Sequence, residues 1–157
     1  MNEKLLANLE GNITILKDFI GKIPEDAILK RRRPDVWTIY EHLEHMSGAQ
    51  VMLLRRIEMF FNEEKPVITP FIPPDKPVEN TTKPVEHLLG TFAKYRMKQL
   101  DAVKKAPDPL WEKKALHPEY SEYSFDTLVR HACLHDSFHM YRIEELWLQN
   151  DAFLKAL

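Results

Sequence analysis

Hydrophobic residues recur every three or four positions in several stretches of the chain, which is the period of an amphipathic α-helix. The first such stripe runs through Leu5, Leu9, Ile13, Leu16 and Ile20. Proline, which interrupts helices, is confined to a few places and leaves four proline-free blocks. Each block is long enough for a helix of about five turns or more. The pattern therefore predicts an all-α protein, a four-helix bundle with its long helices in the blocks 2–23, 35–65, 85–106 and 119–157.

Local signals indicate where three of these helices begin. Thr38 and Glu41 have the spacing of a capping box, in which each side chain bonds to the backbone of the other. Ser124 is a suitable N-cap for the last helix, with Asp126 favourably placed in its first turn. Pro84 is expected in the first turn of the third helix.

A long proline-rich connection, residues 64–83, joins the second and third predicted helices. Proline favours extended backbone at about 3.1 Å per residue, so roughly twenty residues reach about 60 Å. A helix of about 26 residues is only about 39 Å long. The connection can therefore return along the whole bundle and leave these two helices parallel, although its length does not require this.

Composition and charge narrow the class of protein. The chain has 157 residues, enough for one core, and we expect a single domain over residues 1–157. Hydrophobic residues make up 44% and the formal net charge is -2, which favours a globular protein that binds no nucleic acid. No apolar stretch is long enough to span a membrane. Cys133 is the only cysteine, which excludes an intramolecular disulfide and favours a reducing, cytoplasmic location.

Histidines on the last predicted helix carry the clearest chemical signal. His135 and His139 are four residues apart, so their side chains lie about 40° apart on its apolar face. This spacing allows two imidazoles to bind one metal ion at about 2.1 Å. Buried imidazoles need a polar partner, and His42 and His45 on the second helix are the natural donors. Three imidazoles would leave open coordination positions, whereas a hydrogen-bonded histidine pair at the bundle edge is the alternative.

Two motifs resemble those of the DinB/YfiT-like superfamily of metal-binding proteins. Residues 37–46 (WTIYEHLEHM) look like the opening of that family's second helix, and residues 131–142 (HACLHDSFHMYR) look like its closing helix. The resemblance implies a bundle of up-down-down-up topology with a long connection between helices two and three, usually a homodimer. It also implies a divalent metal ion held by one histidine of helix two and two of helix four. By motif position these are His45, His135 and His139.

The resemblance also implies an activity. Members with an assigned activity resemble thiol S-transferases, in which the metal lowers the pKa of a thiol that attacks an electrophile. We therefore expect one divalent ion (zinc, nickel, iron or manganese), a low-molecular-weight thiol and a small-molecule substrate. The alternative is a non-catalytic or stress-related bundle, in which the ion stabilises the fold or senses metal availability. A di-iron carboxylate bundle is disfavoured, because only Asp136 and His139 approach its Glu-x-x-His motif.

Three further residues accompany the predicted ligands. His42 and His131 lie about one turn before His45 and His135 and are expected to support the ligands or to be polar core residues. Asp136 is expected either to orient a ligand histidine or to form a surface or interhelix hydrogen bond.

Arg142 stands where the family has glutamine, one turn beyond the last histidine. It is expected either to bind an anionic group of a substrate or to form an ion pair at the edge of the bundle with a carboxylate such as Glu41 or Glu44. Trp37, directly before Thr38, is expected to pack as a hydrophobic staple.

Overall fold

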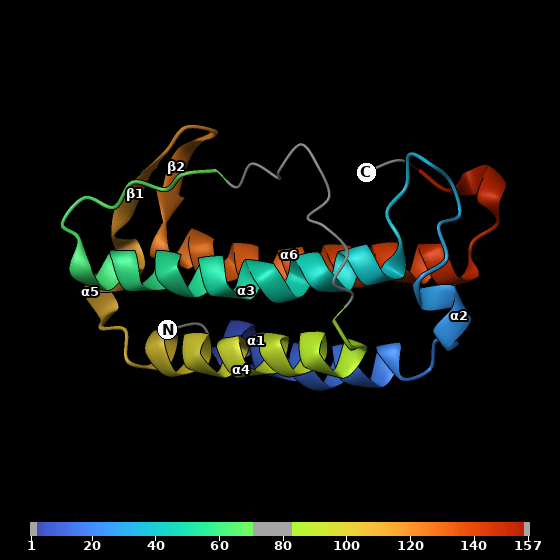
Figure 1. Ribbon diagram of the computed structural model, residues 1–157. Helices are drawn as coiled ribbons and strands as arrows, with labels where there is room; N and C mark the ends of the chain where they lie inside the picture. The colour runs from blue at the N-terminus through green and yellow to red at the C-terminus, as the bar shows by residue number, and fades with distance from the viewer. Residues whose placement is uncertain (1–2, 71–82, 156–157) are drawn as a thin grey trace.

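The computed structural model describes residues 3–70 and 83–155, which contain four long helices (Figure 1). They are α1 (Glu3–Ile20), α3 (Ile39–Asn62), α4 (Val85–Lys104) and α6 (Phe125–Leu148). Each lies within one predicted block, so the prediction of a mainly helical fold is confirmed. The shorter elements are α2 (Glu25–Ile28), α5 (Asp108–Glu112), β1 (Lys114–His117), β2 (Tyr120–Ser124) and the 3-10 helix η1 (Asp151–Phe153).

Side-chain caps fix the first turns of the two helices that carry the predicted histidines. Thr38 Oγ1 accepts a hydrogen bond from Glu41 N at 3.1 Å, and Thr38 N donates to Glu41 Oε2 at 2.7 Å. Ser124 Oγ accepts from Thr127 N at the start of α6. Pro84 is the N-cap residue of α4, just before the first turn in which it was expected. These bonds satisfy N–H groups that have no partner within the helix.

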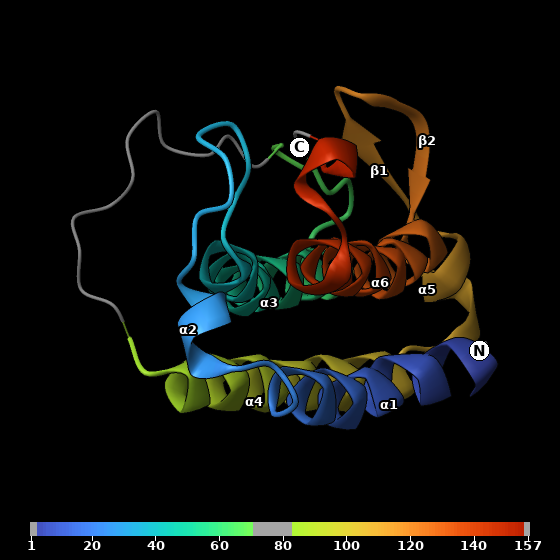
Figure 2. The ribbon, with the colours of Figure 1, turned by 90° about the vertical axis from the view of Figure 1, so that its right-hand side faces the viewer.

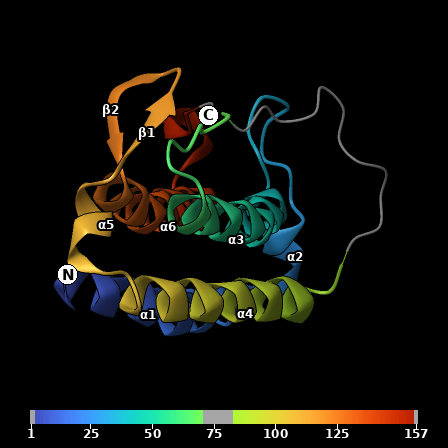
Figure 3. The same ribbon diagram turned by 90° about the vertical axis from the view of Figure 1, so that its left-hand side faces the viewer.

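The long helices form two layers (Figures 2 and 3). α3 and α6 lie side by side in one layer, with α1 and α4 beneath them. α3 and α4 run in the same direction, because Tyr40 near the start of α3 bonds to Lys83 just before α4, and Gln50 further along bonds to Arg96. α6 runs the opposite way, as the colour gradient in Figure 1 shows.

Two expectations from the sequence can be compared with the structure only within the described residues. The path of the proline-rich connection falls mostly on residues 71–82, which lie outside the described residues. No helix in the described ranges is both long enough and apolar enough to cross a membrane.

A two-stranded antiparallel hairpin departs from the all-α expectation. Ala115 of β1 lies opposite Tyr123 of β2. Ile68 N donates to Leu116 O and Leu116 N donates to Pro66 O, both at 2.8 Å, so the start of the proline-rich connection lies along β1. The strands are short and mostly exposed, and therefore show no hydrophobic alternation. The hairpin stands on the outer face of the α3–α6 layer (Figure 1).

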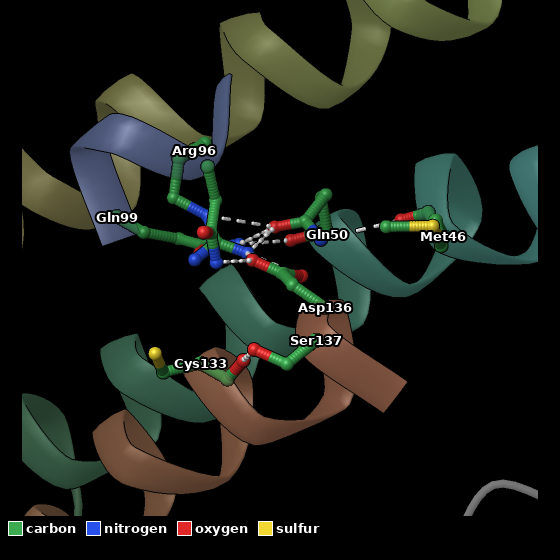
Figure 4. Close-up of polar contacts among 8 residues, drawn as sticks. Met46, Gln50, Arg96, Gln99, Cys133, Asp136 and Ser137 are labelled. Atoms are coloured by element: carbon green, nitrogen blue, oxygen red, sulfur yellow. Dashed lines mark hydrogen bonds and ion pairs between the residues drawn. The ribbon is translucent and has the colours of Figure 1, made fainter. Parts of the chain in front are cut away.

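A buried polar network crosses the middle of the bundle, between two hydrophobic clusters (Figure 4). Arg96 of α4 and Asp136 of α6 form a 2.8 Å ion pair in which neither side chain is exposed. Asn12 of α1 donates to Asp136, and Gln50 of α3 accepts from Arg96. All four long helices therefore contribute to one network, which fixes the position of α6 relative to the other three.

Candidate metal centre

Three histidines from two helices converge in the α3–α6 layer. The antiparallel packing places His45 of α3 opposite His135 of α6, with their Nε2 atoms 3.0 Å apart. The ring centroid of His139 lies 4.6 Å from that of His45. One nitrogen from each of the three histidines lies within 4.8 Å of the other two. The structure therefore brings together the three residues to which the family motifs point.

His42 forms a hydrogen-bonded pair with His139. Their Nδ1 atoms lie 2.8 Å apart, so one ring donates a proton to the other. His42 is completely buried, and its Nε2 has no hydrogen-bond partner in the described part of the chain. Because Nδ1 of His139 takes part in this bond, Nε2 is the atom left to bind a metal ion.

Trp37 packs against the histidines from the turn before α3. Its indole is nearly parallel to the His139 ring, with centroids 6.3 Å apart and planes 12° apart. It also lies 5.2 Å from the His42 ring and 5.4 Å from the His45 ring. Trp37 precedes the N-cap and His42 is the fourth helical residue, as in a hydrophobic staple. The sequence indicates the staple but not the contact with His139, which depends on how α6 packs.

Burial keeps the clustered imidazoles neutral. It lowers the pKa of His42, His135 and His139 to about 3, and the charge of a nearby arginine adds to the effect at His42 and His135. Burial also lowers the pKa of His45. A neutral imidazole keeps the lone pair that binds a metal ion, so the group need not lose protons first at neutral pH.

The donor set fits a divalent transition-metal ion. Two nitrogens about 2.1 Å from one tetrahedral ion lie about 3.4 Å apart, close to the 3.0 Å between Nε2 of His45 and Nε2 of His135. His135 Nδ1 is also buried with no hydrogen bond in the described ranges. Nitrogen ligands of this kind accept zinc, nickel, iron or manganese.

Asp136 follows His135 in sequence but points into the bundle core. Its carboxylate pairs with Arg96 and accepts a hydrogen bond from Asn12. No hydrogen bond among the described residues joins it to a histidine. Burial raises the pKa of Asp136, while Arg96 acts in the opposite direction. The structure thus favours the interhelix hydrogen bond over the orientation of a ligand.

Arg142 pairs within its own helix. It forms an ion pair with Glu145 and donates to the backbone oxygen of Lys155. The expected ion pair with a carboxylate is therefore present, but its partner is Glu145 and not Glu41 or Glu44. The residues after α6 fold back to Arg142 and supply its second partner. Both side chains of the Arg142–Glu145 pair are at most 10% exposed, which leaves little of this charge for a substrate.

A groove of about 480 Å³ opens along α6 beside the histidines. His135 lines it together with His131, one turn earlier, and Tyr120 of the hairpin. Leu134 and Phe138 add apolar surface. The volume is in the range of small-molecule sites. His131, whose role the sequence left open, therefore lines the approach to a candidate metal ligand.

The fold and the three facing histidines together define the class of protein: a helical bundle with a candidate metal centre. The sequence profile of the DinB superfamily matches residues 8–143, and the chain belongs to this superfamily. Among solved structures, YfiT from Bacillus subtilis has a similar fold, with a TM-score of 0.80 at 16% identity over 92% of this chain and 84% of YfiT. YfiT is described as a probable metal-dependent hydrolase with an unusual four-helix bundle topology. Among curated proteins, none matches this chain.

Proposed function

We propose that this protein binds one divalent metal ion through His45, His135 and His139 and acts as a metal-dependent enzyme of the thiol S-transferase type. The observation that carries the proposal is the convergence of three neutral imidazoles, with nitrogens within 4.8 Å, beside a groove of small-molecule size. Membership of the DinB superfamily supports the metal, and the resemblance to its thiol-dependent members supports the reaction.

The number of protein ligands favours catalysis over a structural role. Structural zinc sites have four protein ligands, whereas catalytic sites have three and leave a position for a substrate. In the described ranges, no carboxylate or thiol joins the histidine group. His42 is the next imidazole, but its Nδ1 is bonded to His139. Of the three histidines, His135 lines the groove, so a substrate bound in the groove would lie beside one of the residues that would hold the ion.

A divalent ion held here would supply the Lewis acidity that stabilises the thiolate form of a thiol. The side chains around it would bind and shield the reactants, since Trp37 packs against the imidazoles and Phe138 lines the groove. Cys133, the only cysteine of the chain, packs against the core, and burial raises the pKa of its thiol. The reacting thiol would therefore come from a small molecule.

A metal-dependent hydrolase is the second candidate, because the fold is similar to that of YfiT, which carries that description. The same three imidazoles would suit hydrolysis, since a divalent ion also lowers the pKa of water. The two reactions differ in their co-substrate, because hydrolysis needs no thiol. A non-catalytic metal-binding role is the third candidate.

We also propose that the protein is a cytoplasmic homodimer. Exposed apolar side chains recur along one face of α6, which supports contact with a second copy. The single cysteine supports a reducing compartment. The exposed residues outside the groove are Tyr141 (60%) and Leu148 (63%).

The proposed reaction is tested by measuring turnover with protein that is loaded with metal, freed of metal, and loaded again. Cysteine, glutathione and bacillithiol would serve as thiols, with 1-chloro-2,4-dinitrobenzene as the electrophile. We expect conjugation that needs both metal and thiol, is lost in His45→Ala and persists in His87→Ala, a change at an exposed histidine of α4. Metal-dependent ester hydrolysis without a thiol would favour the hydrolase. A melting temperature that depends on metal, with no turnover, would favour the non-catalytic role.

A further inference from the structure

The groove along α6 gathers aromatic and apolar side chains that are exposed to solvent. Tyr120 of β2, Leu134 and Phe138 line it and are 45%, 61% and 49% exposed, respectively. A patch of exposed apolar side chains is a common mark of a binding site. The volume of about 480 Å³ suits a small molecule. The groove therefore presents aromatic and apolar surface to a ligand of that size.

At the hairpin end of the groove, neighbouring rings hold the ring of Tyr120 in place. Its centroid lies 4.7 Å from that of His117 and 5.5 Å from that of Tyr123, and both contacts are edge-to-face. Tyr123 is buried and so anchors this side of the hairpin to the bundle. The ring of His131, which also lines the groove, lies 6.2 Å from that of Tyr120. Two rings from different elements therefore stand close together at this end.

The ring of Phe138 lies further along α6, next to the candidate metal centre. It makes an edge-to-face contact with His139, with centroids 5.1 Å apart and planes 79° apart. Phe138 follows His131 by seven residues, which is a distance of about 10 Å along the helix. Leu134 and His135 lie between these two rings and also line the groove. A molecule that spans this distance would contact a ring at each end and would pass His135.

The groove has little unpaired charge. Arg130 lines it and forms an ion pair with Asp126 at 2.6 Å, and no aspartate or glutamate is among the described residues that line it. Burial lowers the pKa of His131, so this imidazole is neutral at neutral pH. The hydroxyl of Thr127 is hydrogen-bonded to that of Ser124 at 3.1 Å. Because an ion that loses water without gaining a partner is destabilised, the groove favours an uncharged ligand.

We infer that this groove binds the electrophile of the proposed reaction, and that this electrophile is an uncharged molecule with a planar aromatic ring. The ring would pack against Tyr120 and Phe138, because aromatic rings attract each other beyond the effect of their apolar area. These two residues would therefore determine specificity without being metal ligands. The aromatic class rests on the lining of the groove, whereas the role of the molecule as electrophile rests on the proposed function.

NMR titration of the full-length, isotope-labelled protein with nitrobenzene and with nitrocyclohexane, its saturated counterpart, tests this site. Both molecules are uncharged and carry one nitro group, so they differ in the planar ring. We expect nitrobenzene to bind at least about threefold more tightly and to shift the backbone amide signals of Leu134 and Phe138. The anion para-nitrobenzoate should bind more weakly than para-nitrobenzamide, its neutral counterpart.

Substitution by leucine separates the effect of a ring from that of apolar volume. Phe138→Leu and Tyr120→Leu should each weaken nitrobenzene binding about three- to tenfold, while nitrocyclohexane binding changes less than about twofold. Both positions are about half exposed, so we expect an unchanged melting temperature. Tyr141→Leu is the matched control, because it removes an exposed ring of α6 outside the groove, and both dissociation constants should equal those of wild type.

The test is independent of the metal centre. His45→Ala should bind nitrobenzene as wild type does, whether or not it holds an ion or has activity, so failure of the proposed function would leave this site in place. The inference would be overturned by absence of nitrobenzene binding, as a second copy of the chain covering the groove would cause, or by equal affinity for nitrobenzene and nitrocyclohexane. Tighter binding of para-nitrobenzoate than of its amide, amide shifts confined to residues outside the groove, or wild-type affinity in both leucine variants would also overturn it.

Discussion

His42 and His139 face each other across the α3–α6 interface with their Nδ1 atoms 2.8 Å apart. This hydrogen bond fixes the orientation of the His139 ring, so that Nε2 is the nitrogen left for the group that includes His45 and His135. We therefore propose that His42 positions a candidate metal ligand and is not a ligand itself.

Replacement of His42 should weaken metal binding without removing the site. In His42→Ala the ring of His139 loses its partner, and the metal dissociation constant should rise about 10- to 100-fold with unchanged stoichiometry. Competition against a chromophoric chelator measures this. His87→Ala, at an exposed position, is the matched control. Equal metal affinity in His42→Ala and wild type would show that the bond has no such role.

The metal-free protein should lose stability on mild acidification. Burial lowers the pKa of His139 to about 3 in the folded state, from its ordinary value of 6.5. Between these values the unfolded chain binds a proton and the folded chain does not, so stability is full above about pH 6.5 and falls below it. Urea unfolding at pH 7.5 and pH 5 measures this loss. Between these pH values the free energy of unfolding should fall by up to about 2 kcal/mol less in His139→Gln than in wild type. Equal losses would show that His139 titrates normally.

Trp37 should report on metal binding. It is the tryptophan that packs on the histidines, whereas Trp111 packs on Phe125 and Trp147 on Phe19. A metal ion should therefore change the tryptophan fluorescence of wild type but not that of Trp37→Phe, although both bind the ion. A full fluorescence change in Trp37→Phe would place the ion elsewhere.

The buried Arg96–Asp136 pair should stabilise the bundle only as a pair. Arg96→Met alone leaves an uncompensated carboxylate in the core and should cost about 3–5 kcal/mol, as should Asp136→Leu. The double variant should recover much of that loss, because no unpaired charge remains. Urea unfolding of the three variants measures the coupling. A double variant that loses as much free energy of unfolding as the two single variants together would contradict this coupling.

Local signals explain which parts of the protein are predictable from sequence. The four long helices follow from hydrophobic period and proline placement, and the start of α3 follows from the spacing of Thr38 and Glu41. The proximity of His135 and His139 is a property of one helix. Their approach to His45 needs the antiparallel packing of α3 and α6, which the family motifs imply but spacing alone does not.

The remaining features depend on how distant segments pack. Asp136 bonds to Asn12 and Arg96, and those partners follow from the positions of α1 and α4. Arg142 bonds to Lys155 because the end of the chain folds back onto α6. Neither contact has a signature in the local sequence. The hairpin was not predicted because its strands are too short and exposed to show alternation.

Elemental analysis of protein purified without a His tag or chelator tests the metal centre most directly. Wild type and His87→Ala should contain about one divalent ion per chain, as one three-histidine site requires. His45→Ala and His139→Ala should each lose the ion while circular dichroism shows the same helix content. Absence of metal from wild type after reconstitution, or full occupancy in both site variants, would contradict a metal centre formed by His45, His135 and His139.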